Sequence, residues 1–142
     1  VLADNFSDRL GIYSFYIDDL HFNLAVQLLN DKYGIQVRGG CSCAGTYGHM
    51  LLDVDINFSH NITDQIDEGD LSLKPGWVRM SIHPTMTDDE MHYIMNAIDD
   101  VAKNHKYLGA DYTYNNQTNE FVYKDNSFSE MNGERAKSWF EL

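Results

Sequence analysis

A long amphipathic segment from Thr87 to Lys106 places the strongest limit on how this chain folds. Its apolar residues recur at about the 3.6-residue period of an α-helix, so they form one stripe. Thr87 and Glu90 match a capping box at its start, and Gly109 is a suitable stop. The stripe contains Met91, Ile94, Met95, Ile98, Val101 and Ala102. We therefore expect a helix over 87–108 that lies against the aliphatic face of a sheet.

Three β-type segments supply the strands for that sheet. Alternating aromatic and β-branched residues predict strands over 11–17 and 77–82, and a third, shorter strand is expected over 35–37. A second amphipathic segment predicts a helix over 21–33. The fold class that follows is α+β: a small, mainly antiparallel sheet covered on one face by the helices 21–33 and 87–108.

The remaining segments carry weaker patterns. A helix is expected from Tyr47 to about Val54, and the polar stretch 55–75 is expected to hold a single turn near Ile62 to Ile66. Tyr112 to Tyr123 predicts two strands around an Asn-rich turn. A short helix is expected from Glu134 to Phe140.

The chain has 142 residues, which fits one domain of ordinary size. We expect that domain over residues 1–110. Residues 111–142 are expected to form an extension, a hairpin plus a short helix, packed on the same domain. Because the chain begins at Val1 rather than at a methionine, we expect a processed chain or a fragment of a longer one.

The composition of the chain limits the classes of partner that it can bind. The formal net charge of −12 argues against nucleic acid and anionic membranes, because both require clustered Lys and Arg. No apolar run is long enough to span a bilayer. Cys41 and Cys43 are too close in sequence for an unstrained disulfide, which favours reduced thiols and a cytoplasmic location. One Cys-x-Cys offers too few ligands for a zinc site. His49 and His60 could complete one, but no second spaced pair supports it, so no metal is expected.

The two cysteines lie in a glycine-rich stretch, 35–49, that also contains Arg38 and His49. A thiol near an arginine has a raised thiolate fraction and can act as a nucleophile. The alternative is an inert thiol packed under the loop. Alternation does not decide between Cys41 and Cys43, and His49 is either a base or a residue without a catalytic role.

Arg38 and Arg79 are expected to project from the same side of the sheet. Val78, Met80 and Ile82 face the helices, so Arg79 points the other way, and Arg38 has the corresponding place on its own strand. A strand-mounted arginine can hold a carboxylate or phosphate through two oxygens at once. The alternative is that each arginine pairs with one of the 22 acidic residues of the chain.

Three segments carry a family resemblance: Gly11–Ile17 (GIYSFYI), Ile35–Ala44 (IQVRGGCSCA) and Trp77–Ile82 (WVRMSI), the last followed by a capped helix. In order and spacing they resemble the C-terminal small domain of class V aminotransferase-fold enzymes, which depend on pyridoxal 5′-phosphate. The cysteine desulfurase and selenocysteine lyase group is the most similar. The resemblance spans about residues 8–108 and implies the C-terminal-domain fold of fold-type I enzymes.

The resemblance implies roles for three residues. Cys43 falls on the nucleophilic cysteine, whose thiolate attacks the substrate sulfur and leaves alanine and an enzyme persulfide. Arg38 falls on the loop arginine, and Arg79 would hold the substrate α-carboxylate. Many relatives have a His pair before the cysteine, where this chain has Cys41 and Ser42. The alternative is a class V aminotransferase that transfers no sulfur.

The cofactor-binding large domain of the family has no counterpart here. None of the six lysines has the sequence context of the family's Schiff-base lysine. We therefore expect this chain to be the substrate-clamping half of an enzyme, binding no cofactor and inactive alone, while the full-length parent is a homodimeric lyase or transferase acting on cysteine, selenocysteine or a similar amino acid. The competing hypotheses are a free-standing module that binds a small acid, and a metal or redox protein built on the Cys-x-Cys.

Overall fold

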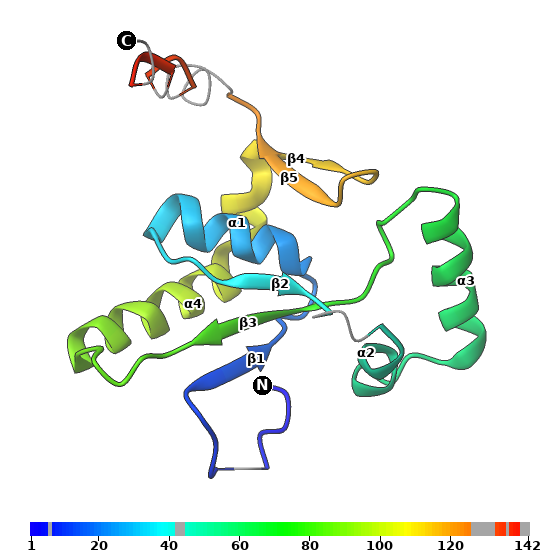
Figure 1. Ribbon diagram of the computed structural model, residues 1–142, viewed down its shortest axis with the longest axis horizontal. Coiled ribbons are helices and arrows are strands. Elements are labelled where there is room, and N and C mark those ends of the chain that lie inside the picture. Colours follow the sequence, from blue (N-terminus) through cyan, green and yellow to red (C-terminus); the bar gives the residue numbers. More distant parts are fainter. Residues whose placement is uncertain (6, 42–44, 126–132, 136, 140–142) are drawn as a thin grey trace.

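The computed structural model describes residues 1–5, 7–41, 45–125, 133–135 and 137–139, and confirms the expected α+β class (Figure 1). The elements in chain order are β1 (Ile12–Phe15), α1 (Phe22–Tyr33), β2 (Arg38–Gly40), α2 (Gly45–Leu51), α3 (Ile56–Asp67), β3 (Trp77–Ser81), α4 (Asp88–Leu108), a 3₁₀ turn (Gly109–Asp111), β4 (Tyr112–Asn115) and β5 (Glu120–Tyr123). Within the expected C-terminal helix, residues 134, 135, 137 and 138 are helical.

The strands form two antiparallel groups. The central sheet has the order β1-β3-β2, so β3 is paired on both sides. β4 and β5 form the expected hairpin, with Tyr112 paired to Tyr123 and Asn115 to Glu120. The predicted strands over 11–17 and 77–82 and the predicted hairpin are confirmed, with ends one or two residues shorter.

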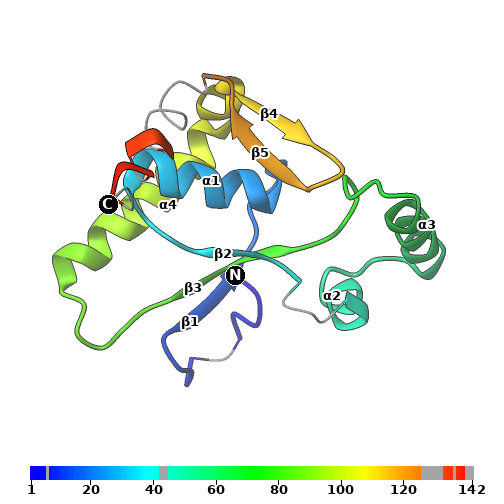
Figure 2. The same cartoon turned by 45° about the horizontal axis from the view of Figure 1, so that its top comes forward.

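The core lies between the central sheet and the helices α1 and α4, which both lie on one side of it (Figure 2). Leu28 and Leu29 from α1, Val78 from β3 and Val101 from α4 are at most 1% exposed. Phe15, Met80 and Ala97 belong to the same buried cluster. The predicted helix coverage of one sheet face is therefore confirmed, and it leaves the other face to the alternate residues of each strand.

The predicted capping box of α4 and glycine stop of α1 are present, and α1 has a cap that the sequence did not predict. Thr87 and Glu90 form a full capping box: the Thr87 backbone N–H donates to Glu90 Oε2 at 2.7 Å, and the Glu90 N–H donates to Thr87 Oγ1 at 3.3 Å. His21 caps α1, because its Nδ1 accepts from the Asn23 N–H at 3.1 Å. Gly34 ends α1 in the left-handed conformation at φ 67°, which glycine adopts without strain.

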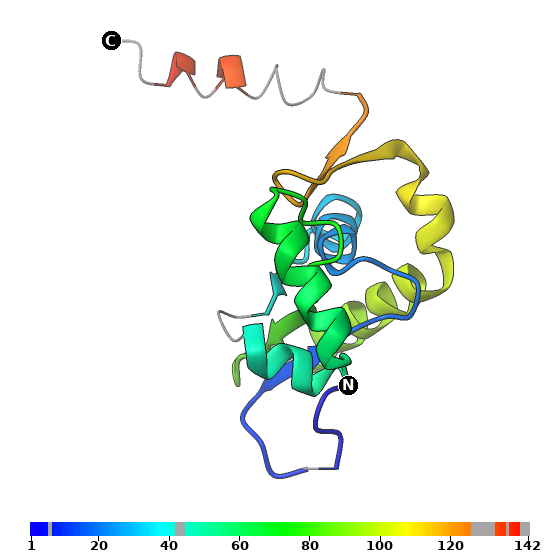
Figure 3. The ribbon, with the colours of Figure 1, turned by 90° about the vertical axis from the view of Figure 1, so that its right-hand side faces the viewer.

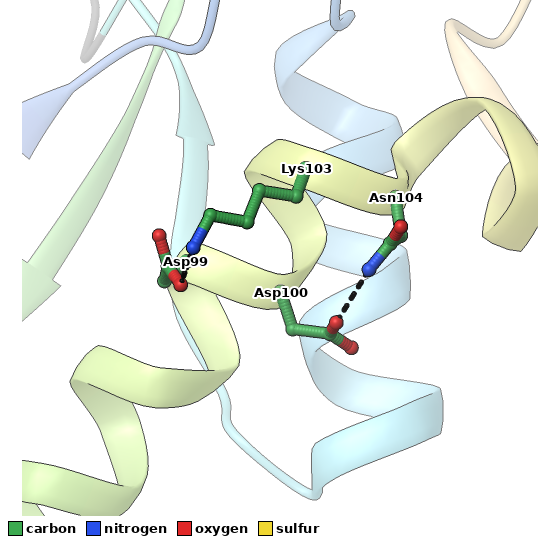
Figure 4. Close-up of polar contacts among 4 residues, drawn as sticks. All are labelled: Asp99, Asp100, Lys103 and Asn104. Atoms are coloured by element: carbon green, nitrogen blue, oxygen red, sulfur yellow. Dashed lines mark hydrogen bonds and ion pairs between the residues drawn. The ribbon is translucent and has the colours of Figure 1, made fainter.

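The polar side of α4 carries two adjacent side-chain pairs, and the partners in each pair lie one helical turn apart (Figure 4). Lys103 Nζ contacts Asp99 Oδ2 at 2.5 Å, and Asn104 donates to Asp100 at 2.6 Å. Exposed pairs of this kind contribute only about 0.3–0.5 kcal/mol. Asp100 has a second role, since it accepts a hydrogen bond from the Tyr33 hydroxyl of α1. That bond, followed by burial, raises the pKa of Tyr33 to about 12, and it ties α1 to α4.

Two sequence-based expectations were wrong. The strand expected over 35–37 is β2 at Arg38–Gly40, because pairing with β3 selects the glycine-rich residues. A Cβ on Gly39 would lie 2.9 Å from Phe22, so α1 packs closer to β2 than a side chain allows. Instead of a single turn near Ile62, the chain forms the 12-residue helix α3. Asp55 starts it by accepting from the Asn57 N–H at 2.9 Å, and Ile62 is buried beneath it.

The helix expected over 47–54 is α2, which begins two residues earlier and ends at Leu51. α2 and α3 form a helical arm at the end of the sheet where β2 ends and β3 begins (Figures 1 and 3). His49 Nδ1 of α2 lies 2.5 Å from Ser59 Oγ of α3, which joins the two helices. None of the helices in the described ranges is both long and apolar enough to cross a bilayer.

Candidate anion-binding face of the sheet

Arg38 and Arg79 are direct partners in the β2–β3 pairing. Directly opposite residues of an antiparallel pair project to the same side, with Cβ atoms about 4.5–5.5 Å apart. Val78 and Met80, the neighbours of Arg79, are buried toward α1 and α4, so both arginines lie on the face that these helices do not cover. The structure thus brings together the two arginines that the sequence placed on one face.

Ser14 extends this row onto the third strand, because it is the β1 partner of Arg79. Arg79 lies between the other two and is half-buried, while Arg38 on the edge strand is exposed. We call Ser14, Arg79 and Arg38 the arginine row. Five N–H donors on each guanidinium and one hydroxyl are therefore available along a single line across the sheet.

Neither arginine of the row is neutralised by the described part of the chain. Within that part, neither Arg38 nor Arg79 makes an ion pair or a side-chain hydrogen bond. The alternative that each arginine pairs with an acidic residue of the chain therefore fails for the described residues. Like charges directly opposite one another are destabilising, so the row favours an anion between the two guanidinium groups.

Trp77 flanks the row on the central strand, next to Arg79 on the same face. It lies two residues before Arg79 on β3, hence on the same face, yet it is only 5% exposed. The cover comes from α2, where a Cβ on Gly48 would lie 3.2 Å from the Trp77 ring and 3.5 Å from Cys41 Cβ. Gly48 thus allows α2 to pack directly on Trp77 and Cys41, at the edge of the arginine row.

The structure describes only one of the two cysteines of the predicted thiol site. Cys43, the candidate nucleophile, lies outside the described residues, as do Ser42 and Ala44. Cys41 is a half-buried free thiol that follows directly on β2 and packs beneath α2. His49 is engaged with Ser59 in the helical arm, which disfavours a role as a base for the thiol. The described residues contain no cluster of three or more His, Cys, Asp or Glu that could hold a metal.

The face does not fit pyridoxal phosphate as a complete site, because no lysine lies on β1, β2, β3 or α2. Lys32 lies over the Tyr123 ring, Lys103 pairs with Asp99, and Lys124 donates to the Ala110 carbonyl. The amine that would anchor this cofactor is therefore not on the arginine row. What the row can do is bind the acidic group of a ligand.

Sequence reasoning missed Ser14 and the Gly48–Trp77 contact. Strand alternation places the side chains of Ser14 and Phe15 on opposite faces of the sheet. Since Phe15 is apolar and expected in the core, the sequence could have predicted that Ser14 lies on the uncovered face. The Gly48–Trp77 contact joins residues 29 positions apart in the chain, with α3 between them. No local sequence pattern encodes such a contact.

Comparisons with known proteins supply no further assignment. The chain matches no known protein family, no curated protein and no solved structure.

Proposed function

We propose that this chain is the substrate-clamping small domain of a pyridoxal-phosphate-dependent class V enzyme, of the cysteine desulfurase and selenocysteine lyase group. The observation that carries the proposal is the arginine row: Arg38 and Arg79 are directly opposed on an uncovered sheet face, and no described residue neutralises them. A row of this kind suits the α-carboxylate of an amino acid. The assignment to this family rests on the sequence motifs at 11–17, 35–44 and 77–82.

Arg79 is the principal carboxylate ligand in this proposal. It lies on the central strand, half-buried and paired on both sides, so its backbone is the more rigid of the two. A guanidinium binds a carboxylate through two parallel N–H···O bonds, which fixes the orientation of the ligand as well as its position. Arg38, on the exposed edge strand, adds positive charge beside the same carboxylate. Ser14 offers a hydroxyl on the other side of Arg79.

Cys43 is the proposed sulfur acceptor, on the strength of its place in the motif. Because Cys41 and Ser42 replace the family's His pair, a class V aminotransferase without sulfur transfer is the alternative within the same fold. The cofactor and its lysine would have to be supplied by residues other than those described here, so no chemical step is assigned to them.

Extending the reading frame upstream is the first test. The proposal expects a few hundred residues with a cofactor-binding lysine, and a start codon directly before Val1 would refute it. In the full-length enzyme, Arg79→Ala should raise KM for the amino acid about tenfold or more while the cofactor absorbance is retained. Arg135→Ala, an exposed arginine remote in sequence from the row, is the matched control.

Cys43→Ser separates the two chemistries in the same enzyme. A desulfurase or lyase loses release of sulfur or selenium, whereas an aminotransferase keeps most of its turnover. Unchanged kinetics in Arg79→Ala would show that the carboxylate lies elsewhere.

A second candidate rests on the same arginine row: a non-catalytic module that binds a small acid. It differs in one measurable respect, because the 142-residue chain alone would then bind a monocarboxylate with full affinity. Calorimetric titration with acetate and with L-alanine, in the wild type and in Arg79→Ala, tests this candidate directly. Arginine-dependent binding by the isolated chain favours the module.

A further inference from the structure

A second candidate site lies between α1 and the β4–β5 hairpin and contains no residue of the arginine row. A cavity of about 360 Å³, open to solvent, is bordered by α1, by the loop before β3 and by the β4–β5 hairpin. Its volume is at the lower end of the range of small-molecule sites, which is about 300–1,000 Å³. The lining residues that matter here are Val26, Gln27, Leu71, Lys74, Glu120 and Phe121.

The walls of this cavity are held by hydrogen bonds among three separate segments. Asn23 of α1 donates to the Asn119 carbonyl of the hairpin turn. The Leu71 N–H, in the loop before β3, donates to the Asn116 carbonyl at 2.8 Å. The Asn119 side chain is 8% exposed and accepts from the Tyr114 hydroxyl at 2.9 Å. The cavity is therefore formed before any ligand arrives.

Two opposite charges line the cavity without pairing. Lys74 from the loop and Glu120 from β5 form no ion pair with each other, and neither side chain makes an ion pair or hydrogen bond with any described residue. Gln27 donates its amide N–H to Asp31 at 2.9 Å, which leaves its carbonyl oxygen as a further acceptor. One cavity thus offers a cation for a carboxylate, and an anion and an amide oxygen for an ammonium group.

We propose that this cavity binds a free apolar α-amino acid as its zwitterion. Lys74 contacts the α-carboxylate, and Glu120 together with the Gln27 carbonyl oxygen contacts the α-ammonium group. Val26, Leu71 and Phe121 provide the apolar surface for the side chain. The site is independent of the proposed function, since it shares no residue with the arginine row.

The test uses the ¹⁵N-labelled 142-residue chain and three probes of nearly equal shape. L-Leucine carries both charges, 4-methylpentanoate lacks the ammonium group, and 3-methylbutylamine lacks the carboxylate. L-Leucine should shift the backbone amide signals of Val26, Leu71 and Phe121, and each analogue should bind about tenfold more weakly. Equal binding of all three probes would overturn the proposal.

Two charge-removing variants test the same contacts from the side of the protein. Lys74→Met and Glu120→Gln should each weaken leucine binding about tenfold. Lys106→Met and Glu134→Gln, at exposed positions that do not line the cavity, should leave it unchanged. Wild-type affinity in both cavity variants refutes the site. Leucine-induced shifts confined to β2 and β3, and lost in Arg79→Ala, would assign the binding to the arginine row instead.

Discussion

Arg38 and Arg79 face each other across the β2–β3 pairing without an acidic partner among the described residues. In the free protein this arrangement should cost stability. Arg38→Gln is therefore expected to raise the free energy of unfolding by about 0.2–1 kcal/mol at low salt, and the lower half of this range applies because Arg38 is exposed. Urea unfolding at about 0.01 M and about 1 M salt provides the measurement, because the Debye length falls from about 30 Å to about 3 Å between them.

The gain from Arg38→Gln should shrink at high salt, and it should be smaller in an Arg79→Gln background, where the repulsion is already gone. Arg135→Gln is the control, with no expected change at either salt concentration. A loss of stability in Arg38→Gln that does not depend on salt would contradict mutual repulsion.

Gly48 and Gly45 form a matched pair on the short helix α2. An added Cβ on Gly48 would lie 3.2 Å from the Trp77 ring, whereas one on Gly45 meets no atom within 4 Å. Gly48→Ala should therefore destabilise the protein by about 1 kcal/mol, and Gly45→Ala should be neutral or slightly stabilising. Trp77 fluorescence, recorded in a Trp139→Phe background, should shift to longer wavelength in Gly48→Ala only. An unchanged spectrum would show that α2 does not pack on Trp77.

His21 makes stability depend on pH. Burial lowers the pKa of His21 below its ordinary value of 6.5, and protonation of Nδ1 would also remove the acceptor that caps α1. The unfolded chain therefore binds a proton at His21 more readily than the folded chain does. The free energy of unfolding keeps its full His21 contribution above pH 6.5, and it decreases as the pH falls through the folded-state pKa. Urea unfolding across this range measures the effect.

His21→Asn replaces the Nδ1 acceptor at the N-cap with an amide oxygen and removes the titrating group. The variant should lose the slope that begins near pH 6.5, whereas His92→Asn, at an exposed position on α4, should keep it. An identical pH profile in His21→Asn and wild type would exclude His21 as the source.

The Tyr112 hydroxyl donates to Asp31 Oδ2 at 2.9 Å and fastens the hairpin to α1. Burial and this bond raise the pKa of Tyr112 above its ordinary value. Burial alone would raise the pKa of Asp31, but the hydrogen bonds from Gln27, Asn30 and Tyr112 outweigh it and lower the pKa. Tyr112→Phe should cost about 0.5–1.5 kcal/mol at neutral pH. Tyr107→Phe, at a residue 82% exposed, should cost nothing measurable.

Acid titration checks the same bond independently. The folded-state pKa of Asp31 is lowered, so its contribution is present above the unfolded value of 3.8 and is lost as the pH falls through the folded one. In Tyr112→Phe this loss should be smaller. An equal loss in both proteins would show that Tyr112 does not stabilise the carboxylate.

Much of the fold follows from local pattern. The stripe of α4, its capping box and the alternation of β3 depend on residues within one or two turns of each other, so the sequence predicted them correctly. The placement of Arg79 away from the helices follows from the buried side chains of Val78 and Met80 beside it. The same logic missed α3 although Phe58, Ile62 and Ile66 recur at the four-residue spacing of a helix face, because these few apolar residues stand among polar ones.

The sequence by itself determined the fold class, the ends of α1 and α4 and the side of the sheet from which each arginine projects, because these properties depend on neighbours in the chain. Only the tertiary structure decided that β2 consists of Arg38–Gly40 and that Arg38 lies opposite Arg79. It also decided that Gly48 packs on Trp77, and that Lys74 and Glu120 line one cavity. Strand register and helix packing depend on contacts between distant segments, which no window of sequence contains.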